Sequence, residues 1–376
     1  MRSLCSAALA VCLCGLAGAL DDKKADEKLT PAEQFKALEK EFNETMTSIQ
    51  KEFVTAKTGE EKNALRKKFF ELRPKYAEKA LALATANPKE PVACEAAIFA
   101  LNMGGGSPVG EKAAELLGST FVNNPKLKSV LGGLGRNPNG AKLLKTIQEK
   151  TTDKDIKGAS AYYIASARLE EADSPPDDGS TPSVEKQAAV FKEIDAQLNK
   201  LAKDYGDVEL IEDGGKQKLS KAVEGQLFYL NNLTVGKVLP DSVAQTLDGK
   251  KAKISDYRGK VVVLDIWATW CGPCRAMIPH ERELVKNLKD KPFVFISLSA
   301  DDKKETLTQF IEKEPMPWVH WWNGGGEGGP VADYKVQFFP TVYVLDEKGV
   351  IRFKHVREKE MDAAIDVLLK EVKPKN

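Results

Sequence analysis

The chain has 376 residues, a length that predicts more than one domain. Its 56 Lys and Arg residues nearly balance its 55 Asp and Glu residues, so the chain has no overall positive field and we expect no nucleic-acid partner. No two of the histidines at 280, 320 and 355 share a metal-ligand spacing. We therefore expect no metal site, and no sequence motif indicates a cofactor.

The first residues have the pattern of an export signal. Arg2 precedes an almost wholly apolar run from Leu4 to Leu16, and Ala17-Gly18-Ala19 supplies the small residues that a signal peptidase accepts. We expect residues 1–19 to be a cleaved signal peptide, and the mature protein to lie outside the cytoplasm, in the periplasm. The alternative is a membrane anchor, but the apolar run is shorter than the ~20 residues that span a bilayer. Leu9–Cys12 is only loosely similar to a lipid-attachment motif.

The stretch 30–172 is predicted to be an all-α domain. Apolar residues recur at steps of three and four, as on one face of a helix, within 35–53 and again within 65–83. Pro74 is expected to kink or divide the second of these helices. Shorter helical segments, separated by Gly, Pro and Asn, are expected around 94–101, 111–122, 141–150 and 156–171. This succession predicts either a helical bundle or a helical-repeat array.

The chain changes character towards its C-terminal end. Residues 173–183 are rich in Pro and Asp and are predicted to form a flexible linker, followed by a connecting helix region at 184–230. Between 235 and 376, helical segments separate apolar runs that are typical of buried strands; these runs are Val261–Leu264, Phe293–Ile296 and Thr341–Leu345. The alternation predicts an α/β domain with a mixed central sheet flanked by helices.

Three cysteines lie beyond the predicted signal peptide. Cys94 stands alone, whereas Cys271 and Cys274 form a C-x-x-C directly after the first buried run, which indicates a redox device and not a structural framework. Unpaired N–H groups at the start of the following helix favour an anion, so we expect the pKa of the Cys271 thiol to fall below the ~8.5 of free cysteine. Cys271 would then attack a partner disulfide, and Cys274 would resolve the mixed disulfide.

The C-terminal part of the chain resembles a known family. The Trp-Cys-Gly-Pro-Cys motif at 270–274, together with 236–241, 247–250 and 254–260, is similar to the TlpA/ResA group of exported thioredoxin-like thiol-disulfide oxidoreductases. Phe339-Pro340-Thr341 matches the cis-proline loop of that superfamily. The resemblance covers about 235–372 and implies a thioredoxin-like fold, with an entry strand at 236–241 and a hairpin at 247–250.

The resemblance also implies roles for individual residues. Asp265 matches the buried carboxylate of thioredoxins, and burial would raise its pKa so that it takes the proton from Cys274 during the resolving step. The lysine that accompanies this acid in thioredoxins has no counterpart near Ser297. Cys271 and Cys274 form the redox-active disulfide in this hypothesis, with Asp265 as the third catalytic residue. The expected substrate-binding residues are Trp270, Gly272, Pro273, Phe339 and Pro340.

The residues between the cysteines bear on the direction of electron flow. Gly272-Pro273 is similar to the reducing members of the superfamily, whereas oxidising members usually carry a histidine there. We therefore expect a reductase of protein disulfides, and the resemblance implies a membrane thiol shuttle that recharges it.

Two other functions remain as alternatives. A thiol peroxidase of a related redoxin family would carry a threonine three residues before its cysteine, where this chain has Ala268. A non-enzymatic alternative is a helical interaction protein whose redox domain acts only as a sensor. Cys94 lies among alanines and is expected to be a small core residue; an intermolecular disulfide is its alternative role.

Overall fold

The computed structural model describes residues 29–135, 138–174, 184–212, 215–326 and 328–372. The predicted signal peptide and most of the predicted linker lie outside the described residues. Within the described part, no helix combines the length and the apolar character that crossing a membrane requires.

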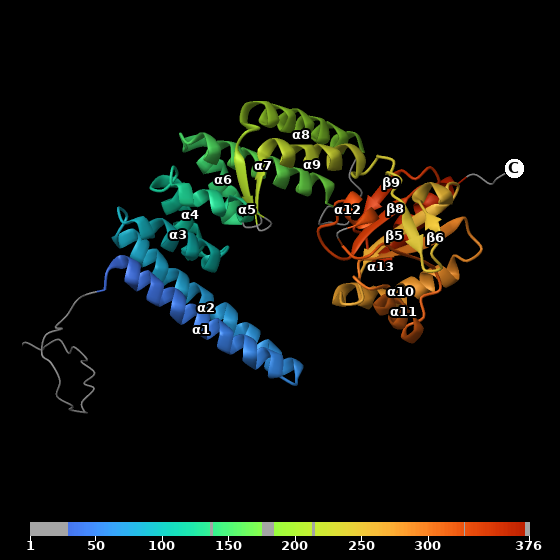
Figure 1. The fold of residues 1–376 in the computed structure, drawn as a ribbon, viewed down its shortest axis with the longest axis horizontal. Coiled ribbons are helices and arrows are strands. Elements are labelled where there is room, and N and C mark those ends of the chain that lie inside the picture. The colour runs from blue at the N-terminus through green and yellow to red at the C-terminus, as the bar shows by residue number, and fades with distance from the viewer. Residues whose placement is uncertain (1–28, 136–137, 175–183, 213–214, 327, 373–376) are drawn as a thin grey trace, which may run out of the picture.

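The N-terminal half is a curved array of helices that ends beside the sheet of the C-terminal half (Figure 1). Each long helix packs mainly against its neighbours in sequence, as in a helical-repeat array and unlike a compact bundle. The helices are α1 (Pro31–Thr55), α2 (Gly59–Ala86), α3 (Pro91–Gly104), α4 (Pro108–Ser119), η1 (Pro125–Ser129), α5 (Leu131–Leu134), α6 (Pro138–Lys150), α7 (Lys154–Asp173), α8 (Val184–Tyr205) and α9 (Leu219–Asn232).

Local sequence explains where α1 begins but not why α2 continues through a proline. Thr30 and Glu33 form a capping box at the start of α1, in which the Glu33 N–H donates to Thr30 Oγ1 at 3.3 Å and the Thr30 N–H donates to the Glu33 carboxylate at 2.8 Å. Pro74 does not divide α2, which runs through it from Gly59 to Ala86. The helix packs against α1 and α3, and its buried residues all follow the proline, from Tyr76 to Ala84.

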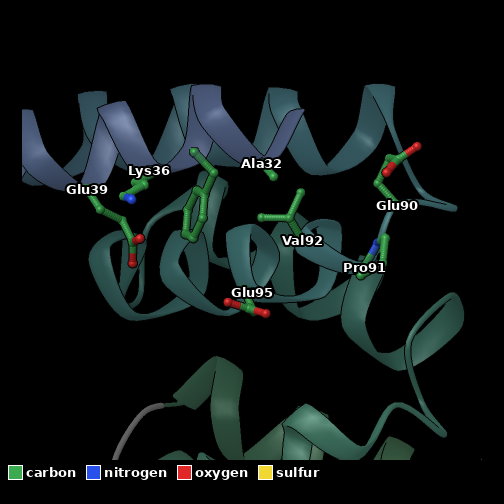
Figure 2. Close-up of a pocket in the computed structure, with 8 residues that line it drawn as sticks. Ala32, Lys36, Glu39, Glu90, Pro91, Val92 and Glu95 are labelled. Carbon is green, nitrogen blue, oxygen red and sulfur yellow. The ribbon is translucent and has the colours of Figure 1, made fainter. Parts of the chain in front are cut away.

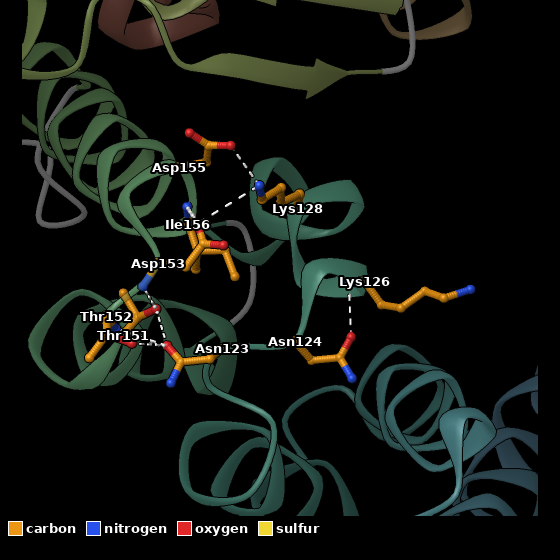
Figure 3. Close-up of polar contacts among 9 residues, drawn as sticks. All are labelled: Asn123, Asn124, Lys126, Lys128, Thr151, Thr152, Asp153, Asp155 and Ile156. Carbon is orange, nitrogen blue, oxygen red and sulfur yellow. Dashed lines mark hydrogen bonds and ion pairs between the residues drawn. The ribbon is translucent and has the colours of Figure 1, made fainter.

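A polar network fixes the turn into α7 against η1 (Figure 3). The side-chain oxygen of Asn123 accepts hydrogen bonds from the Thr151 hydroxyl and the Thr152 N–H, both at 2.8 Å. Asp153 caps α7 by accepting from the Ile156 N–H at 2.9 Å. Lys128 of η1 binds the Asp155 carboxylate at 2.6 Å. Asp153 thus satisfies a free N–H group at the start of α7. The contacts of Asn123 and Lys128 connect this helix start to η1 and to the residues just before it.

The region 184–230 was expected to be a connecting helix region, but it is not helical throughout. Between α8 and α9 lies an antiparallel hairpin of β1 (Glu209–Glu212) and β2 (Gly215–Lys218). Leu210 of β1 is buried in the core of the helical half. The Asp-Gly pair at 213–214 is a hairpin signal in the sequence, and the sequence analysis did not use it.

The C-terminal half is a thioredoxin-like α/β unit with a mixed sheet flanked by helices, as predicted. The strands are β3 (Ala244–Thr246), β4 (Lys251–Ala252), β5 (Val261–Trp267), β6 (Phe293–Ser299), β7 (Val319–Trp322), β8 (Thr341–Leu345) and β9 (Ile351–Lys354), in the order β4-β3-β7-β6-β5-β8-β9. The helices are η2 (Ile254–Tyr257), α10 (Gly272–Asn287), α11 (Lys304–Lys313), α12 (Gly329–Asp333) and α13 (Glu358–Glu371). β5 pairs parallel with β6 and antiparallel with β8.

Alternation along β5 separates two cores. Val261 and Val263 pack with α10 and α13 on one face, whereas Leu264 packs with α11 and α12 residues on the other. Every residue of β5 is buried, because helices cover both faces of the sheet. β5 is therefore a rigid central strand from which the following loop and α10 extend.

The expected entry strand at 236–241 is not a strand. The segment makes one isolated antiparallel bridge, of Val238 with Val350, and a few backbone hydrogen bonds on either side of it to Gly349 and Ile351. Pro240 has no N–H to donate to a ladder, and Gly236 has a φ of 88°, outside the range of extended backbone. The expected hairpin around 247–250 is present, as the turn between β3 and β4.

A buried ion pair joins the two halves of the molecule. Lys354 at the end of β9 reaches Asp173, the last residue of α7, and the Tyr229 hydroxyl of α9 donates to the same carboxylate. The Lys354 Nζ also lies 2.6 Å from the Tyr229 hydroxyl oxygen. The side chains of Lys354 and Asp173 are 1% and 3% exposed. Asp173, predicted to begin a flexible linker, is thus part of α7 and of a fixed contact.

Loss of one partner of this ion pair should be costly. Lys354→Met would leave the Asp173 carboxylate buried without its cation, and we expect the free energy of unfolding to fall by about 3–5 kcal/mol in urea titration. The double variant Lys354→Met/Asp173→Leu should recover most of that loss. Lys79→Met, which breaks the exposed pair of Lys79 with Glu41, is the control and should cost less than about 1 kcal/mol. Equal losses for Lys354→Met and Lys79→Met would contradict the assignment.

Candidate active site

Cys271 and Cys274 lie at the start of α10 and are joined by a disulfide. Cys271 is the N-cap of the helix, and its Sγ accepts a hydrogen bond from the Cys274 N–H at 3.2 Å. The sulfur therefore occupies the place that a Ser or Asp oxygen takes at other helix starts, where free N–H groups and the helix dipole favour negative charge. This geometry favours the thiolate of Cys271 after reduction.

An exposed rim surrounds the disulfide. Trp270 is 67% exposed, and its ring meets that of Phe339 edge-on, with 5.5 Å between the ring centroids. Phe339 precedes Pro340, and the peptide bond between them is cis. Gly272 and Pro273 are also exposed. The structure thus brings the two sequence-distant groups of expected substrate-binding residues together at one surface, whereas Pro340 itself is buried.

Asp265 lies inside the protein near the end of β5, six residues before Cys271. It is 4% exposed, and its Oδ1 has no hydrogen-bond partner. Burial raises the pKa of the Asp265 carboxyl, and the positive charge of Arg357 opposes the shift only in part. A carboxyl group with a raised pKa can take up and release a proton near neutral pH, as general acid–base chemistry requires. Arg357 is thus a cation that acts on Asp265, and the sequence analysis did not name it.

Asp301 is a positioning residue that the sequence analysis missed. Its carboxylate accepts hydrogen bonds from the Thr269 N–H at 3.1 Å, the Thr269 hydroxyl at 2.7 Å and the Ser299 hydroxyl at 2.7 Å. Thr269 belongs to the loop that carries Trp270 and Cys271. Because β5 and β6 are parallel, their ends meet at one edge of the sheet, and a polar residue after β6 at that edge was the available signal.

The other candidate groups lie apart from the disulfide. Cys94 is wholly buried in the core of the helical half, where burial raises the pKa of its thiol to about 12. His320 is held between the Ser297 hydroxyl at 2.7 Å and the Met316 carbonyl at 2.8 Å. Burial lowers the pKa of His320. Neither residue is placed to take part in exchange at Cys271. Among the described residues, no group of three or more His, Cys, Asp and Glu side chains could hold a metal ion.

A hollow of about 660 Å³ lies at the far end of the helical array, between α1 and α3 (Figure 2). Its polar lining consists of three glutamates and one lysine, namely Glu39, Glu90, Glu95 and Lys36. None of these groups is a nucleophile for sulfur chemistry. Exchange with a protein disulfide does not need an enclosed pocket. Cys271 itself is only 5% exposed, but it lies next to the exposed Trp270 and Gly272, so the candidate site stays at Cys271.

The chain is similar to several known proteins. The redoxin family model matches residues 234–368. The thioredoxin-like protein YneN of Bacillus subtilis is 36% identical over 137 residues, which are 35% of this chain and 79% of YneN. The thiol-disulfide oxidoreductase ResA of Bacillus thuringiensis is 29% identical over 151 residues, 40% of this chain and 86% of ResA. The solved thioredoxin domain of a thiol-disulfide oxidoreductase from Bacteroides vulgatus matches with a TM-score of 0.34 and 26% identity, over 38% of this chain and all of that domain.

The chain therefore belongs to the redoxin family of thioredoxin-like proteins. It is an enzyme of the thiol-disulfide oxidoreductase class, and the resemblance predicted from its motifs is confirmed. The family model matches the C-terminal part of the chain, from residue 234 to residue 368.

The N-cap position of Cys271 gives a direct prediction. In reduced chain carrying Cys274→Ser, we expect the Cys271 thiol to titrate below the ~8.5 of free cysteine, measured by the ultraviolet absorbance of the thiolate. Cys94 should not contribute over this range, because burial raises the pKa of its thiol to about 12. The double variant Cys271→Ser/Cys274→Ser provides that baseline. A Cys271 midpoint at or above the free value would contradict the proposed activation.

Proposed function

We propose that this protein is an extracytoplasmic reductase of protein disulfides. The observation that carries the proposal is the Cys271 sulfur, which caps the N-terminus of α10 beside an exposed aromatic rim. A nucleophilic sulfur at such a place can meet a disulfide on the surface of another protein. Trp270 and Phe339 supply apolar area for the polypeptide around that disulfide.

In the proposed reaction, the Cys271 thiolate attacks one sulfur of the client disulfide. A bond forms between the two sulfurs, the client S–S bond breaks, and the electron pair leaves on the second client sulfur, which takes a proton from water. Cys274 then passes its proton to the Asp265 carboxylate and attacks Cys271 Sγ. The Cys271–Cys274 bond forms, and the first client sulfur leaves as a thiolate. The client is reduced by two electrons, and the dithiol of the enzyme is oxidised to the disulfide.

The Gly272-Pro273 pair supports this direction of electron flow. A histidine beside the first cysteine would stabilise its thiolate and so the reduced enzyme, which makes an oxidant. This chain has glycine and proline there instead, so its disulfide form is the more stable product. Each turnover leaves Cys271 and Cys274 oxidised, and a thiol donor must return two electrons. If residues 1–19 direct export, that donor is a membrane shuttle with a thiol on the outer side.

Two alternatives give different outcomes in simple assays. In the thiol peroxidase alternative the protein would consume hydrogen peroxide, although Ala268 stands where such enzymes carry a threonine. In the non-enzymatic alternative the protein would bind a partner through the helical array and reduce nothing, and its relatives among the thiol-disulfide oxidoreductases argue against this alternative. Insulin reduction and peroxide consumption together separate all three functions.

We expect the reduced wild-type chain to reduce insulin disulfides, and Cys271→Ser to lose at least about a hundredfold in rate, because it removes the attacking sulfur. Cys94→Ser is the matched control, since it removes a buried thiol away from the site and should keep the rate. Peroxide consumption by the wild type without insulin reduction would instead support the peroxidase alternative.

The resolving cysteine provides a second prediction, which also identifies the client. Cys274→Ser should accumulate mixed disulfides between Cys271 and client proteins, visible as high-mass bands that disappear on treatment with excess dithiol. The double variant Cys271→Ser/Cys274→Ser is the control and should trap nothing. Failure of Cys274→Ser to trap any protein in exporting cells would argue against a protein client.

A further inference from the structure

Glu281 is a second buried carboxyl group, on the helix that carries the disulfide at its start, and the reaction described above does not use it. Its side chain is 1% exposed, and its Oε1 has no hydrogen-bond partner. Asp265 is likewise buried with an unpartnered Oδ1. In the part of the chain that the structure describes, neither carboxylate takes part in an ion pair within 4.0 Å. Buried acids without partners are rare, because burial of an unpaired charge is costly.

The two acids come from facing elements. Met277 and Leu284, four residues before and three residues after Glu281 on α10, pack in one cluster with Val261 and Val263 of β5. Side chains at these spacings share one face of a helix, so Glu281 lies on the strip of α10 that covers β5. Asp265 points to the same side of the sheet as Val263, because alternate residues of a strand share a face. Glu281 and Asp265 therefore enter the same interior layer.

Glu281 is also aligned with the resolving cysteine. Cys274, Met277, Ile278, Glu281 and Leu284 form the buried side of α10. Seven residues correspond to about two turns, or roughly 10 Å along the helix axis. The inner face of one helix thus carries the Cys274 thiol at its start and a carboxyl group two turns on, with Asp265 on the strand beneath.

The other polar groups around this layer leave the pair with little positive charge. Arg357, just before α13, is the cation that acts on Asp265. His355 follows β9, and burial lowers the pKa of its ring to about 4, so it is neutral. On β6 and β7, Ser297 and His320 are bonded to each other. His280 of α10 is paired with Asp362 of α13 at 2.9 Å.

Two carboxylates in one apolar layer cannot both ionise easily. Burial raises the pKa of both acids, and the negative charge on Asp265 raises the pKa of Glu281 further. The positive charge of Arg357 acts on Asp265 and not on Glu281, so we expect the first proton to leave Asp265 and the second to leave Glu281 only at higher pH. This is the arrangement by which paired acids acquire different roles in one site.

We propose that Asp265 and Glu281 act as one unit that carries a single negative charge in its working state, with protonated Glu281 keeping that charge on Asp265 beside Cys274. Glu281 is a positioning residue in this scheme, because it touches no reacting sulfur. The inference rests on the proposed function only where Asp265 accepts the Cys274 proton. Ionisation of Glu281 at alkaline pH would add a second charge below Cys274 and make its thiolate harder to form.

The direct test follows the titration of the two side-chain carboxyls by 13C NMR in the full reduced chain, with labelled Asp and Glu. In the wild type, we expect Asp265 to titrate first and Glu281 at higher pH, both above their ordinary range. Asp265→Asn should move the Glu281 midpoint down by about one pH unit or more, since the like charge is gone. Glu281→Gln assigns the signal, and Glu281→Leu serves the same purpose if the glutamine variant does not fold.

Glu283→Gln is the matched control, because Glu283 lies on the exposed side of the same helix and should leave both midpoints unchanged. A Glu281 midpoint in the ordinary range of glutamate, or one that Asp265→Asn does not move, would overturn the proposal. These readings need no disulfide substrate. A chain that fails to reduce insulin would therefore sink the proposed function while leaving the acid pair testable.

A kinetic test examines the same pair during exchange. The rate at which Cys274 resolves a mixed disulfide between Cys271 and a small aromatic thiol can be followed by stopped flow across pH. We expect the wild type and Glu281→Gln to agree within about twofold near neutral pH, because glutamine mimics protonated glutamate. At alkaline pH the wild type should lag behind Glu281→Gln, since only the wild type gains the second charge. Parallel profiles over the whole range would contradict the assigned role of Glu281.

Discussion

The chemistry of this protein depends on one sulfur that takes the place of a helix cap. Cys271 accepts the Cys274 N–H at the start of α10, and it can do so only if the helix begins at that residue and at that angle to the sheet. Three features serve this placement: the burial of every residue of β5, the hydrogen bonds that Thr269 donates to Asp301, and the packing of Met277 and Leu284. A helix start that shifted by one residue would lose the favourable field of the free N–H groups, because the effect is confined to the first turn.

The interior beneath the disulfide is unusual for a protein core. Asp265, Glu281 and Asp301 are all buried there, but their surroundings differ. Asp301 receives hydrogen bonds from Ser299 and Thr269 and acts as a structural anchor. Asp265 and Glu281 each keep an unpartnered oxygen, an arrangement that lowers stability and shifts the pKa values of both groups. Such perturbed acids are typical of functional sites, where proton transfer makes use of the shift.

The helical half makes direct contacts with the redox unit. The ion pair of Lys354 with Asp173 connects β9 to α7, and Tyr229 of α9 completes the cluster. On the same side, the Lys335 Nζ lies 5.8 Å from the ring centroid of Phe228, so α9 also contacts the segment that leads to the cis-proline. A client that approaches Trp270 and Phe339 therefore meets a redox unit whose orientation relative to the helical array is set by buried contacts.

The local pattern of the sequence was enough to predict what depends on short spacings. The C-x-x-C after a buried run is visible in the sequence itself. The α/β character of 235–376 and the helices of the first half follow from periodicities of two and 3.6 residues, which involve only residues that are close together in the chain. The hairpin at 209–218 and the continuity of α2 through Pro74 did not follow, because packing against neighbouring helices outweighed the local preference. The strand that the family pattern suggested at 236–241 is also missing, but for a local reason: Pro240 has no N–H to donate to a ladder and Gly236 has a positive φ.

The partnership of Asp265 with Glu281 and Arg357, and that of Asp173 with Lys354, belong to the tertiary structure alone. Glu281 differs from the other charged residues of α10 only by standing at a core position of the helix, and the sequence does not say which strand that position faces. Asp173 and Lys354 are separated by 181 residues. Such pairs become meaningful only when the fold removes water from both members, since burial, and not spacing, decides whether a charge needs a partner.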